Sequence, residues 1–132
     1  MTEFDFEVEI DVRFRDIDAM GHVNNAVYAT YLEQARVRYI EEVLGEPLLE
    51  TGAVIADLQI DFERPIDWGE AVTVAVRAEE PRTASIPMTY EVRADGEVAA
   101  RAETTLVVFD REAGESTPMP EEWRERIRDH ER

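Results

Sequence analysis

The segment best suited to chemistry runs from Asp16 to Asn25 and contains two aspartates, a histidine and two adjacent asparagines. A strand pattern precedes it and a long helix pattern follows, so we expect a loop that leads into a helix start. The first N–H groups of a helix lack partners inside the helix and favour nearby negative charge. A carboxylate beside such donors supplies a base or nucleophile together with an oxyanion site. This combination is the minimum needed to hydrolyse an activated carbonyl.

Two strong patterns flank this loop. Apolar and charged residues alternate strictly from Phe4 to Arg15, which predicts a strand with one buried face. Apolar residues at three- and four-residue spacings predict one long helix over about Ala26–Leu44, closed by Gly45 and Pro47. The width of its apolar stripe indicates that a sheet covers this helix.

Four later segments show strand patterns, near 54–62, 72–78, 86–92 and 98–109. In the first of them the alternating residues are Val54, Ala56, Leu58, Ile60 and Phe62. Asp95-Gly96, between the last two segments, is a strong hairpin signal. These patterns favour an antiparallel sheet.

The tail, about Pro120–His130, predicts a short docked helix with Trp123 and Ile127 as its anchors. The resulting order, β-α-β-β-β-β with one long helix against an antiparallel sheet, is of the α+β class. No internal repeat, linker or low-complexity segment interrupts the 132 residues. We therefore expect a single domain spanning 1–132.

The charge balance excludes several classes of partner. The chain has 31 acidic and 14 basic residues, a net charge of −17, and every basic residue is arginine. So acidic a surface repels nucleic acid and anionic membranes. There are no cysteines, which excludes disulfides, thiolate catalysis and cysteine metal sites. With neither an apolar run long enough to span a bilayer nor a signal-peptide pattern, we expect a cytoplasmic protein.

The residues from Phe14 to Tyr28, continuing through Glu33-Gln34-Ala35-Arg36, resemble the 4-hydroxybenzoyl-CoA thioesterase-like branch of the hotdog-fold superfamily, in particular the acyl-CoA thioesterases that carry G-H-V-N-N. Phe62–Ile66 and Trp68–Glu70 are similar to the strand-turn-strand that follows the helix in that family. The resemblance implies a hotdog fold, in which a five-stranded antiparallel sheet wraps the long helix. It also implies a homodimer or homotetramer with the site at the dimer interface, an acyl-CoA substrate, and no metal or cofactor.

The resemblance assigns catalysis to the second carboxylate of the D-x-D-x-x-G motif, here Asp18. This residue either attacks the thioester carbonyl or activates a water molecule, and a plain turn aspartate is the competing interpretation. The family's oxyanion donor falls at about Asn25 and is a main-chain N–H. His22 is a candidate for orienting the substrate or Asp18, and Asp16 is expected to be structural.

Further residues are expected around the substrate. Those near the loop and helix start are Gly21, Val23, Asn24 and Tyr28, with Asn24 and Asn25 also able to act as helix caps. The candidates for binding the phosphates of coenzyme A are Arg64, Arg82, Arg93 and Arg101, because a guanidinium holds phosphate at two points. Ser85 occupies a position where the family often has a small hydroxyl residue, and Glu33 is expected to play a supporting part.

Two other functions remain open at this point. Hotdog enoyl-thioester hydratases or dehydratases use an Asp and a His in a D-x-N-P-x-H arrangement, whereas Asp18 and His22 are one residue closer together and lack the Asn and Pro. The second alternative is a non-catalytic protein that binds acyl thioesters, which would have no need of Asp18. The acyl group, and its delivery by coenzyme A or by an acyl carrier protein, are also open.

The distribution of charge generates a prediction about salt. Acidic residues lie along the whole chain and lysine is absent, which favours adaptation to molar salt, as in proteins of salt-accumulating haloarchaea, over an acidic interaction protein. Because concentrated salt screens repulsion between surface carboxylates to within a few ångströms, the melting temperature should rise as KCl increases towards molar concentration. Thermal unfolding followed by circular dichroism would measure this, and a melting temperature independent of KCl would contradict it.

Overall fold

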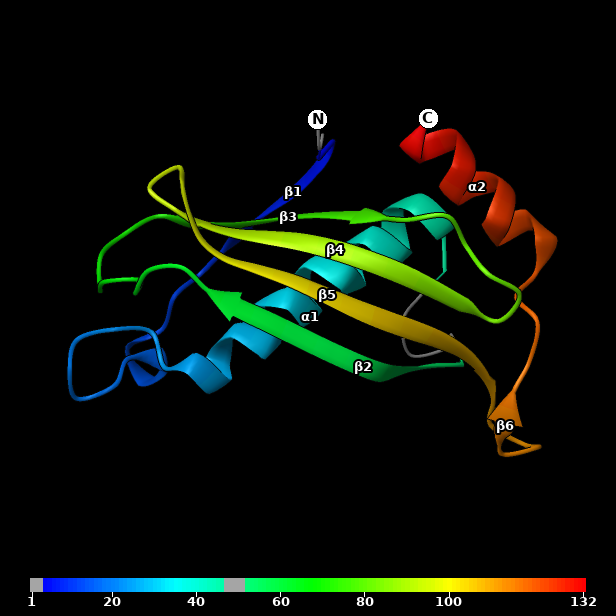
Figure 1. Ribbon diagram of the computed structural model, residues 1–132, viewed down its shortest axis with the longest axis horizontal. Helices are drawn as coiled ribbons and strands as arrows, with labels where there is room; N and C mark the ends of the chain where they lie inside the picture. Colours follow the sequence, from blue (N-terminus) through cyan, green and yellow to red (C-terminus); the bar gives the residue numbers. More distant parts are fainter. Residues whose placement is uncertain (1–3, 47–51) are drawn as a thin grey trace.

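The computed structural model describes residues 4–46 and 52–132. Within these ranges, five strands form an antiparallel sheet in the order β1-β3-β4-β5-β2, and a short sixth strand, β6, pairs with β5. The strands are β1 (Phe6–Ile10), β2 (Ala53–Phe62), β3 (Val72–Ala78), β4 (Ser85–Ala94), β5 (Glu97–Asp110) and β6 (Glu115–Ser116). The helices are α1 (Tyr28–Tyr39) and α2 (Glu121–Glu131). The sheet curls around α1, which crosses one of its faces (Figure 1), and the predicted α+β hotdog arrangement is confirmed.

Strand β1 is shorter than the predicted Phe4–Arg15. Among the described residues its one partner strand is β3, and in their register Ile10 lies opposite Val72, the first residue of β3. No partner therefore remains beyond Ile10, and the chain turns into a 3-10 helix at Phe14–Asp16. The alternating pattern continues past the point where the sheet can pair with it.

The predicted helix over Ala26–Leu44 is confirmed in extent. A 3-10 turn at Asn25–Val27, then α1, then a π-helical segment at Ile40–Leu44 follow one another along the chain. Gly45 ends the run with φ of 73°, the left-handed region that favours glycine. Pro47 lies outside the described residues. The start of this helical run directly follows the Asp16–Asn25 loop.

A bulge changes which residues of β2 face the helix. The register with β5 shifts between Ile55 and Asp57, so Ile55 lies opposite the buried Leu106, whereas Val54 lies opposite the half-buried Val107. The expectation that Val54 shares a face with Leu58, Ile60 and Phe62 is therefore wrong. The residues on the inner face, towards α1, are Ala53, Ile55, Leu58, Ile60 and Phe62.

The helix does not cover this inner face of β2. Leu58 and Phe62 are 45% and 46% exposed, and Val54 on the outer face is 46% exposed. By contrast, α1 packs against β1 and β3, and β3 and β4 contribute many of the buried side chains of the core. Strand β2 lies at the edge of the sheet, so both its outer edge and its apolar inner face are left open.

Helix α2 docks as predicted, with Trp123 and Ile127 buried. Its last residue, Glu131, also bonds to the body of the domain. Oε2 of Glu131 accepts hydrogen bonds from the Tyr39 hydroxyl at 2.5 Å and from the Ala78 N–H at 2.9 Å. Burial, and then the bond to Glu131, raise the pKa of Tyr39 well above its ordinary value. The tail thus ties α1 to β3 at the end of the domain away from the loop.

Candidate active site

The loop before α1 is a tight turn centred on Asp18 and Gly21. The Asp18 N–H donates to the His22 carbonyl at 2.8 Å, and the Gly21 N–H donates to the Asp18 carbonyl at 3.1 Å. Gly21 has φ of 82°, where a side chain would be strained, so the turn depends on glycine. Gly21, which the sequence places among the residues around the substrate, thus shapes the loop that carries Asp18.

The Asp18 carboxylate is exposed, and only one of its two oxygens accepts hydrogen bonds among the described residues. Its Oδ1 accepts from the N–H groups of Met20 at 2.9 Å and His22 at 3.2 Å. Oδ2 has no hydrogen-bond partner among the described residues. The backbone therefore fixes the orientation of the carboxylate and leaves one oxygen available to a ligand.

The N–H groups of Val23, Asn24 and Asn25, at the start of the helix, differ in their availability. The Val23 N–H donates to the Ile66 carbonyl at 2.9 Å and the Asn24 N–H donates to the Asp16 carbonyl at 2.8 Å, so neither is free to bind a substrate oxygen. Asn24 instead caps the helix, with its Oδ1 accepting from the Ala26 N–H at 2.9 Å. Asn25 is the first helical residue, and its N–H has no acceptor within the helix. The geometry leaves Asn25 as the available donor.

Asp18 and Asn25 line the same groove, which we call the loop groove, with a volume of about 550 Å³. It is lined by Asp18, His22, Val23, Asn24, Asn25, Tyr28, Phe62, Glu63, Arg64 and Pro65. Seven of the predicted site residues are among these. The Tyr28 ring meets the Phe62 ring edge-on at 4.9 Å, which gives one side of the groove an apolar wall.

Sequence reasoning missed Phe62, Glu63 and Pro65 as lining residues. Their resemblance to the family's strand-turn-strand was the available signal, but no spacing rule relates them to a loop some 40 residues earlier. Of the predicted residues, Ser85 does not line the loop groove. It begins β4, whereas the other end of that strand, Ala94, lies beside Arg64.

His22 is held at the mouth of the loop groove by Asp67. Its Nε2 lies 3.4 Å from Asp67 Oδ1, and a backbone bridge joins the same two residues. A neighbouring hydrogen bond reinforces this contact: the Trp68 N–H donates to the Gly21 carbonyl at 3.1 Å. The segment after β2 therefore holds the Asp16–Asn25 loop in place through Asp67 and Trp68.

Arg64 is engaged as a structural clamp. Its two terminal nitrogens hold both carboxylate oxygens of Glu70 at 3.1 and 2.8 Å, and also donate to the carbonyls of Pro65 and Ala94, each at 2.8 Å. These four bonds use all four terminal N–H groups. The predicted role in binding phosphate would require Arg64 to give them up. Of the other candidates, Arg93 and Arg101 also form ion pairs with carboxylates.

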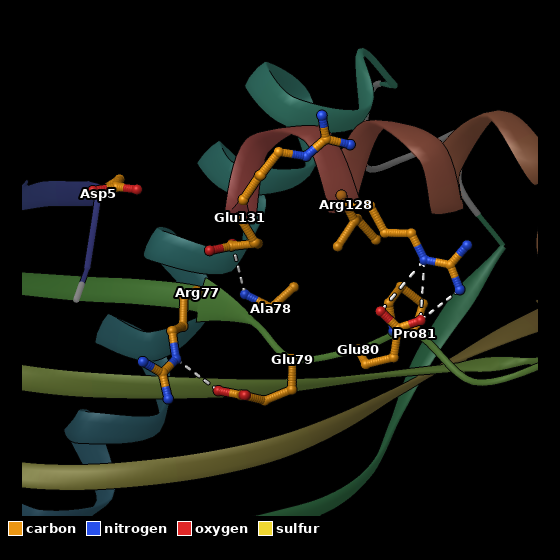
Figure 2. A pocket seen from close by; sticks show the side chains of 10 residues that line it. Asp5, Arg77, Ala78, Glu79, Glu80, Pro81, Arg128 and Glu131 are labelled. Carbon is orange, nitrogen blue, oxygen red and sulfur yellow. Dashed lines mark hydrogen bonds and ion pairs between the residues drawn. The ribbon is translucent and has the colours of Figure 1, made fainter. Parts of the chain in front are cut away.

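A groove larger than the loop groove lies elsewhere, between α2 and the turn from β3 to β4 (Figure 2). Its volume is about 710 Å³. Four of the charged side chains that line it are paired with one another: Arg77 with Glu79, and Arg128 with Glu80. We therefore interpret this groove as the margin of the docked helix, and the loop groove as the candidate site.

Two properties of the described residues bear on other classes of function. No group of three or more His, Cys, Asp or Glu side chains there could hold a metal ion. No helix in that part of the chain is long and apolar enough to cross a membrane.

Comparisons with known proteins agree on one family. The sequence profile of the thioesterase-like superfamily matches residues 12–127. The chain is 43% identical to a thioesterase from Thermus thermophilus solved in complex with coenzyme A and Zn, with a TM-score of 0.88 over 96% of this chain and 99% of that one. It is 24% identical over 126 residues to the long-chain acyl-CoA thioesterase FadM of Escherichia coli, covering 92% of this chain and 96% of FadM. It is also 35% identical over 81 residues to the acyl-acyl carrier protein thioesterase ATL3 of Arabidopsis thaliana, covering 58% of this chain and 42% of ATL3.

A sheet curled around one long helix is the hotdog fold. The chain belongs to the thioesterase-like superfamily, and it is a thioester hydrolase.

The clamp between Arg64 and Glu70 generates a prediction about acid stability. Hydrogen bonds from Arg64, and then from the Asp67 N–H, hold the pKa of Glu70 below its ordinary value. A carboxyl whose pKa is depressed on folding stabilises the native state above its unfolded pKa of about 4.3, and this stability is lost as the pH falls through the folded value. Glu70→Gln should therefore lower the free energy of unfolding at neutral pH, and its difference from wild type should shrink below about pH 4.3.

Urea unfolding at several pH values between neutral and about pH 3 would measure this difference. Glu103→Gln is the matched control, because Glu103 is exposed on β5 and has no side-chain hydrogen bond or ion pair among the described residues. A gap between Glu70→Gln and wild type that stays constant down to the lowest pH would contradict the prediction.

Proposed function

We propose that this chain is an acyl-CoA thioesterase that hydrolyses the thioester to a free acid and coenzyme A, with Asp18 acting on the carbonyl. The observation that carries the proposal is the loop groove itself. One oxygen of Asp18 has no partner among the described residues, and the first N–H of the helix, at Asn25, lines the same groove. The thioesterase from Thermus thermophilus that was solved with coenzyme A supports the choice of substrate.

Two routes give the same balance of atoms. Asp18 either takes a proton from a water molecule, whose oxygen attacks the carbonyl, or attacks the carbonyl itself and forms an anhydride that water then cleaves. In both routes the carbonyl oxygen becomes negative and the Asn25 N–H stabilises it, helped by the positive end of the helix. The carbon–sulfur bond breaks, the thiolate of coenzyme A leaves and is protonated, and water supplies the oxygen of the new acid.

The remaining residues have supporting roles in this proposal. Gly21 allows the turn, Val23 and Asn24 hold the backbone of the helix start, and Tyr28 forms the wall of the acyl pocket with Phe62. His22, held by Asp67, orients the loop. The proposal places the chain in the G-H-V-N-N subgroup and in the cytoplasm, and it needs no cofactor or metal.

The catalytic assignment predicts that Asp18→Asn abolishes hydrolysis while preserving the fold. The amide keeps an acceptor for the Met20 N–H but cannot act as a base or anionic nucleophile, so turnover should fall by about 10²-fold or more. Thiol release from a panel of short, medium, long and aromatic acyl-CoAs in molar KCl would measure it, because a chain without cysteine adds no thiol background.

Two further variants sharpen this test. Asp11→Asn is the matched control, because Asp11 is exposed and its side chain has no partner among the described residues. Asn25→Ala should lower turnover much less than Asp18→Asn, since the proposed donor is the main chain. Undiminished hydrolysis by folded Asp18→Asn would contradict the assignment. Loss of enoyl absorbance without thiol would indicate a hydratase instead, and binding without turnover would indicate a binding protein.

We also propose that the active form is a homodimer, or a tetramer of two such dimers, paired through β2. An edge strand offers unpaired N–H and C=O groups to another strand. On β2 this edge coincides with the exposed side chains of Val54, Leu58 and Phe62. Phe62 also lines the loop groove, so a second chain on β2 would enclose the substrate.

The assembly is tested at Val54, which lies on the face of β2 away from the loop groove and α1. Val54→Asp would bury an unpaired charge in a paired interface, so it should shift the protein towards monomers and reduce thiol release with them. Sedimentation velocity beside the activity assay would measure both. A wild-type monomer with full turnover would overturn the proposed dimer.

A further inference from the structure

Arg36 is a buried cation without a carboxylate partner among the described residues. It lies on α1 and is only 8% exposed. Its single hydrogen bond in that part of the chain runs from Nη1 to the Tyr90 hydroxyl at 3.3 Å, and that hydroxyl lies 2.7 Å from Thr104 Oγ1. A guanidinium has five N–H donors, and a buried charge is costly unless an anion compensates it. The fold has therefore left most of the hydrogen-bonding capacity of Arg36 unused.

The position of Arg36 connects it to the proposed active site. Tyr28, Leu32 and Arg36 are spaced four residues apart and share one face of α1. Tyr28 lines the loop groove, and Arg36 lies eight residues further along, about 12 Å at 1.5 Å per residue. The guanidinium is thus two turns deeper along the helix than the groove where we place the thioester.

The inner face of β2 follows the same path. Phe62 packs on Tyr28 at the groove, and Leu58 lies opposite Thr104, which bonds the tyrosine that accepts from Arg36. Phe62, Ile60 and Leu58 are alternate residues on one face, so they form an apolar stripe about 13 Å long at 3.3 Å per residue. Leu58 and Phe62 are nearly half exposed, so this stripe is still open to a ligand.

We propose that Arg36 binds a carboxylate at the far end of the acyl chain, so that the preferred substrates are ω-carboxyacyl thioesters. The proposal rests on the proposed thioesterase function and names its substrate class. Such a molecule matches the stripe in order: the thioester at Asp18 and Asn25, methylene groups along Phe62 and Leu58, and an anion at Arg36. The phosphates of coenzyme A cannot serve as this anion, because they lie on the other side of the thioester from the acyl chain.

The length of the stripe sets the length of the chain. An extended chain advances about 1.2 Å per bond, since three backbone bonds span about 3.5 Å in an extended polypeptide. The stripe therefore takes about ten bonds, and fewer if the Arg36 side chain leans towards the start of the helix, as helical side chains do. We expect acyl chains of about six to ten carbons.

A second copy of the chain is the competing source of an anion for Arg36. The inner face of β2 carries only apolar residues, so a copy paired through β2 brings no carboxylate from that strand. Its α1 carries the exposed Glu33, which could still reach Arg36. The experiment therefore has to separate a substrate contact from an interface contact.

The test compares two series of coenzyme A thioesters with about six, eight and ten carbons, one ending in a carboxylate and one in a methyl group. Wild type should hydrolyse the carboxylate series with at least about tenfold higher kcat/KM, as a hydrogen bond to a charged group is worth about 1.5–3 kcal/mol. Arg36→Met should remove this preference and leave the methyl series unchanged or improved. Arg36→Lys should keep part of it.

Arg38→Met is the matched control, because Arg38 is an exposed arginine on the same helix, paired with Glu42. It should keep the wild-type preference. Wild type that hydrolyses both series equally would overturn the inference while supporting the thioesterase, whereas no thiol release from either series would overturn the thioesterase itself. If Arg36→Met slows both series equally and alters the sedimentation of the assembly, Arg36 is an interface contact and the inference is wrong.

Discussion

The conformation of the Asp16–Asn25 loop depends on the hydrogen bonds that converge on Asp16. One oxygen of its carboxylate, Oδ2, accepts from the Arg13 N–H at 2.9 Å and from the Tyr31 hydroxyl at 2.8 Å, while its carbonyl accepts from the Asn24 N–H at 2.8 Å. Asp16 thus joins the segment after β1, the buried face of α1 and the helix cap at Asn24. Burial, and then the bond to Asp16, raise the pKa of Tyr31 above its ordinary value, so its hydroxyl remains a donor. These bonds of Asp16 fix the loop that contains Asp18 to α1. Asp18 and Asn25, at the start of the helical run, line the same groove.

Strand β2, at one edge of the sheet, differs from the loop in how well its groups are paired. Hydrogen bonds within one chain hold the Asp16–Asn25 loop, whereas the outer edge of β2 has no partner strand among the described residues and its side chains Val54, Leu58 and Phe62 are exposed. Phe62, which forms one wall of the loop groove, belongs to this edge strand. The Asp18 carboxylate is therefore oriented within each chain, whereas the loop groove has a wall on a strand that is open at the edge of the described sheet.

Structural features that depend on local periodicity were predicted correctly from the sequence. Features that depend on pairing with a strand far away in the sequence were not. The helix, the Asp95-Gly96 hairpin and the docked tail follow from spacing and turn chemistry, and all three are present. The first strand was overextended because its length is set by where β3 begins. The face of Val54 was wrong because a bulge leaves no mark in an alternating pattern.

The same distinction applies within the site. Asp18 and Asn25 come from one contiguous motif, and they line one groove. The engagement of Arg64 could not be predicted, because its partners are a carboxylate six residues away and a carbonyl 30 residues away. Likewise, the bonds that occupy the Val23 and Asn24 N–H groups involve carbonyls that only the folded chain brings close.

The arginines of this acidic chain show why hydrogen-bond satisfaction is a better guide to binding than charge alone. Nine arginines form ion pairs with carboxylates among the described residues, as expected where acids outnumber bases so heavily. Arg64 lies at the groove, yet its four terminal N–H groups are all used, and only its Nε, 3.6 Å from Glu97, lacks a hydrogen bond among the described residues. Arg36 lies deeper and has one bond among the described residues, to a neutral hydroxyl. Keeping a cation buried without an anion costs stability, and a ligand that supplies the anion recovers that cost on binding. This difference in satisfaction, rather than proximity to the loop, is why we assign substrate recognition to Arg36 and a structural role to Arg64.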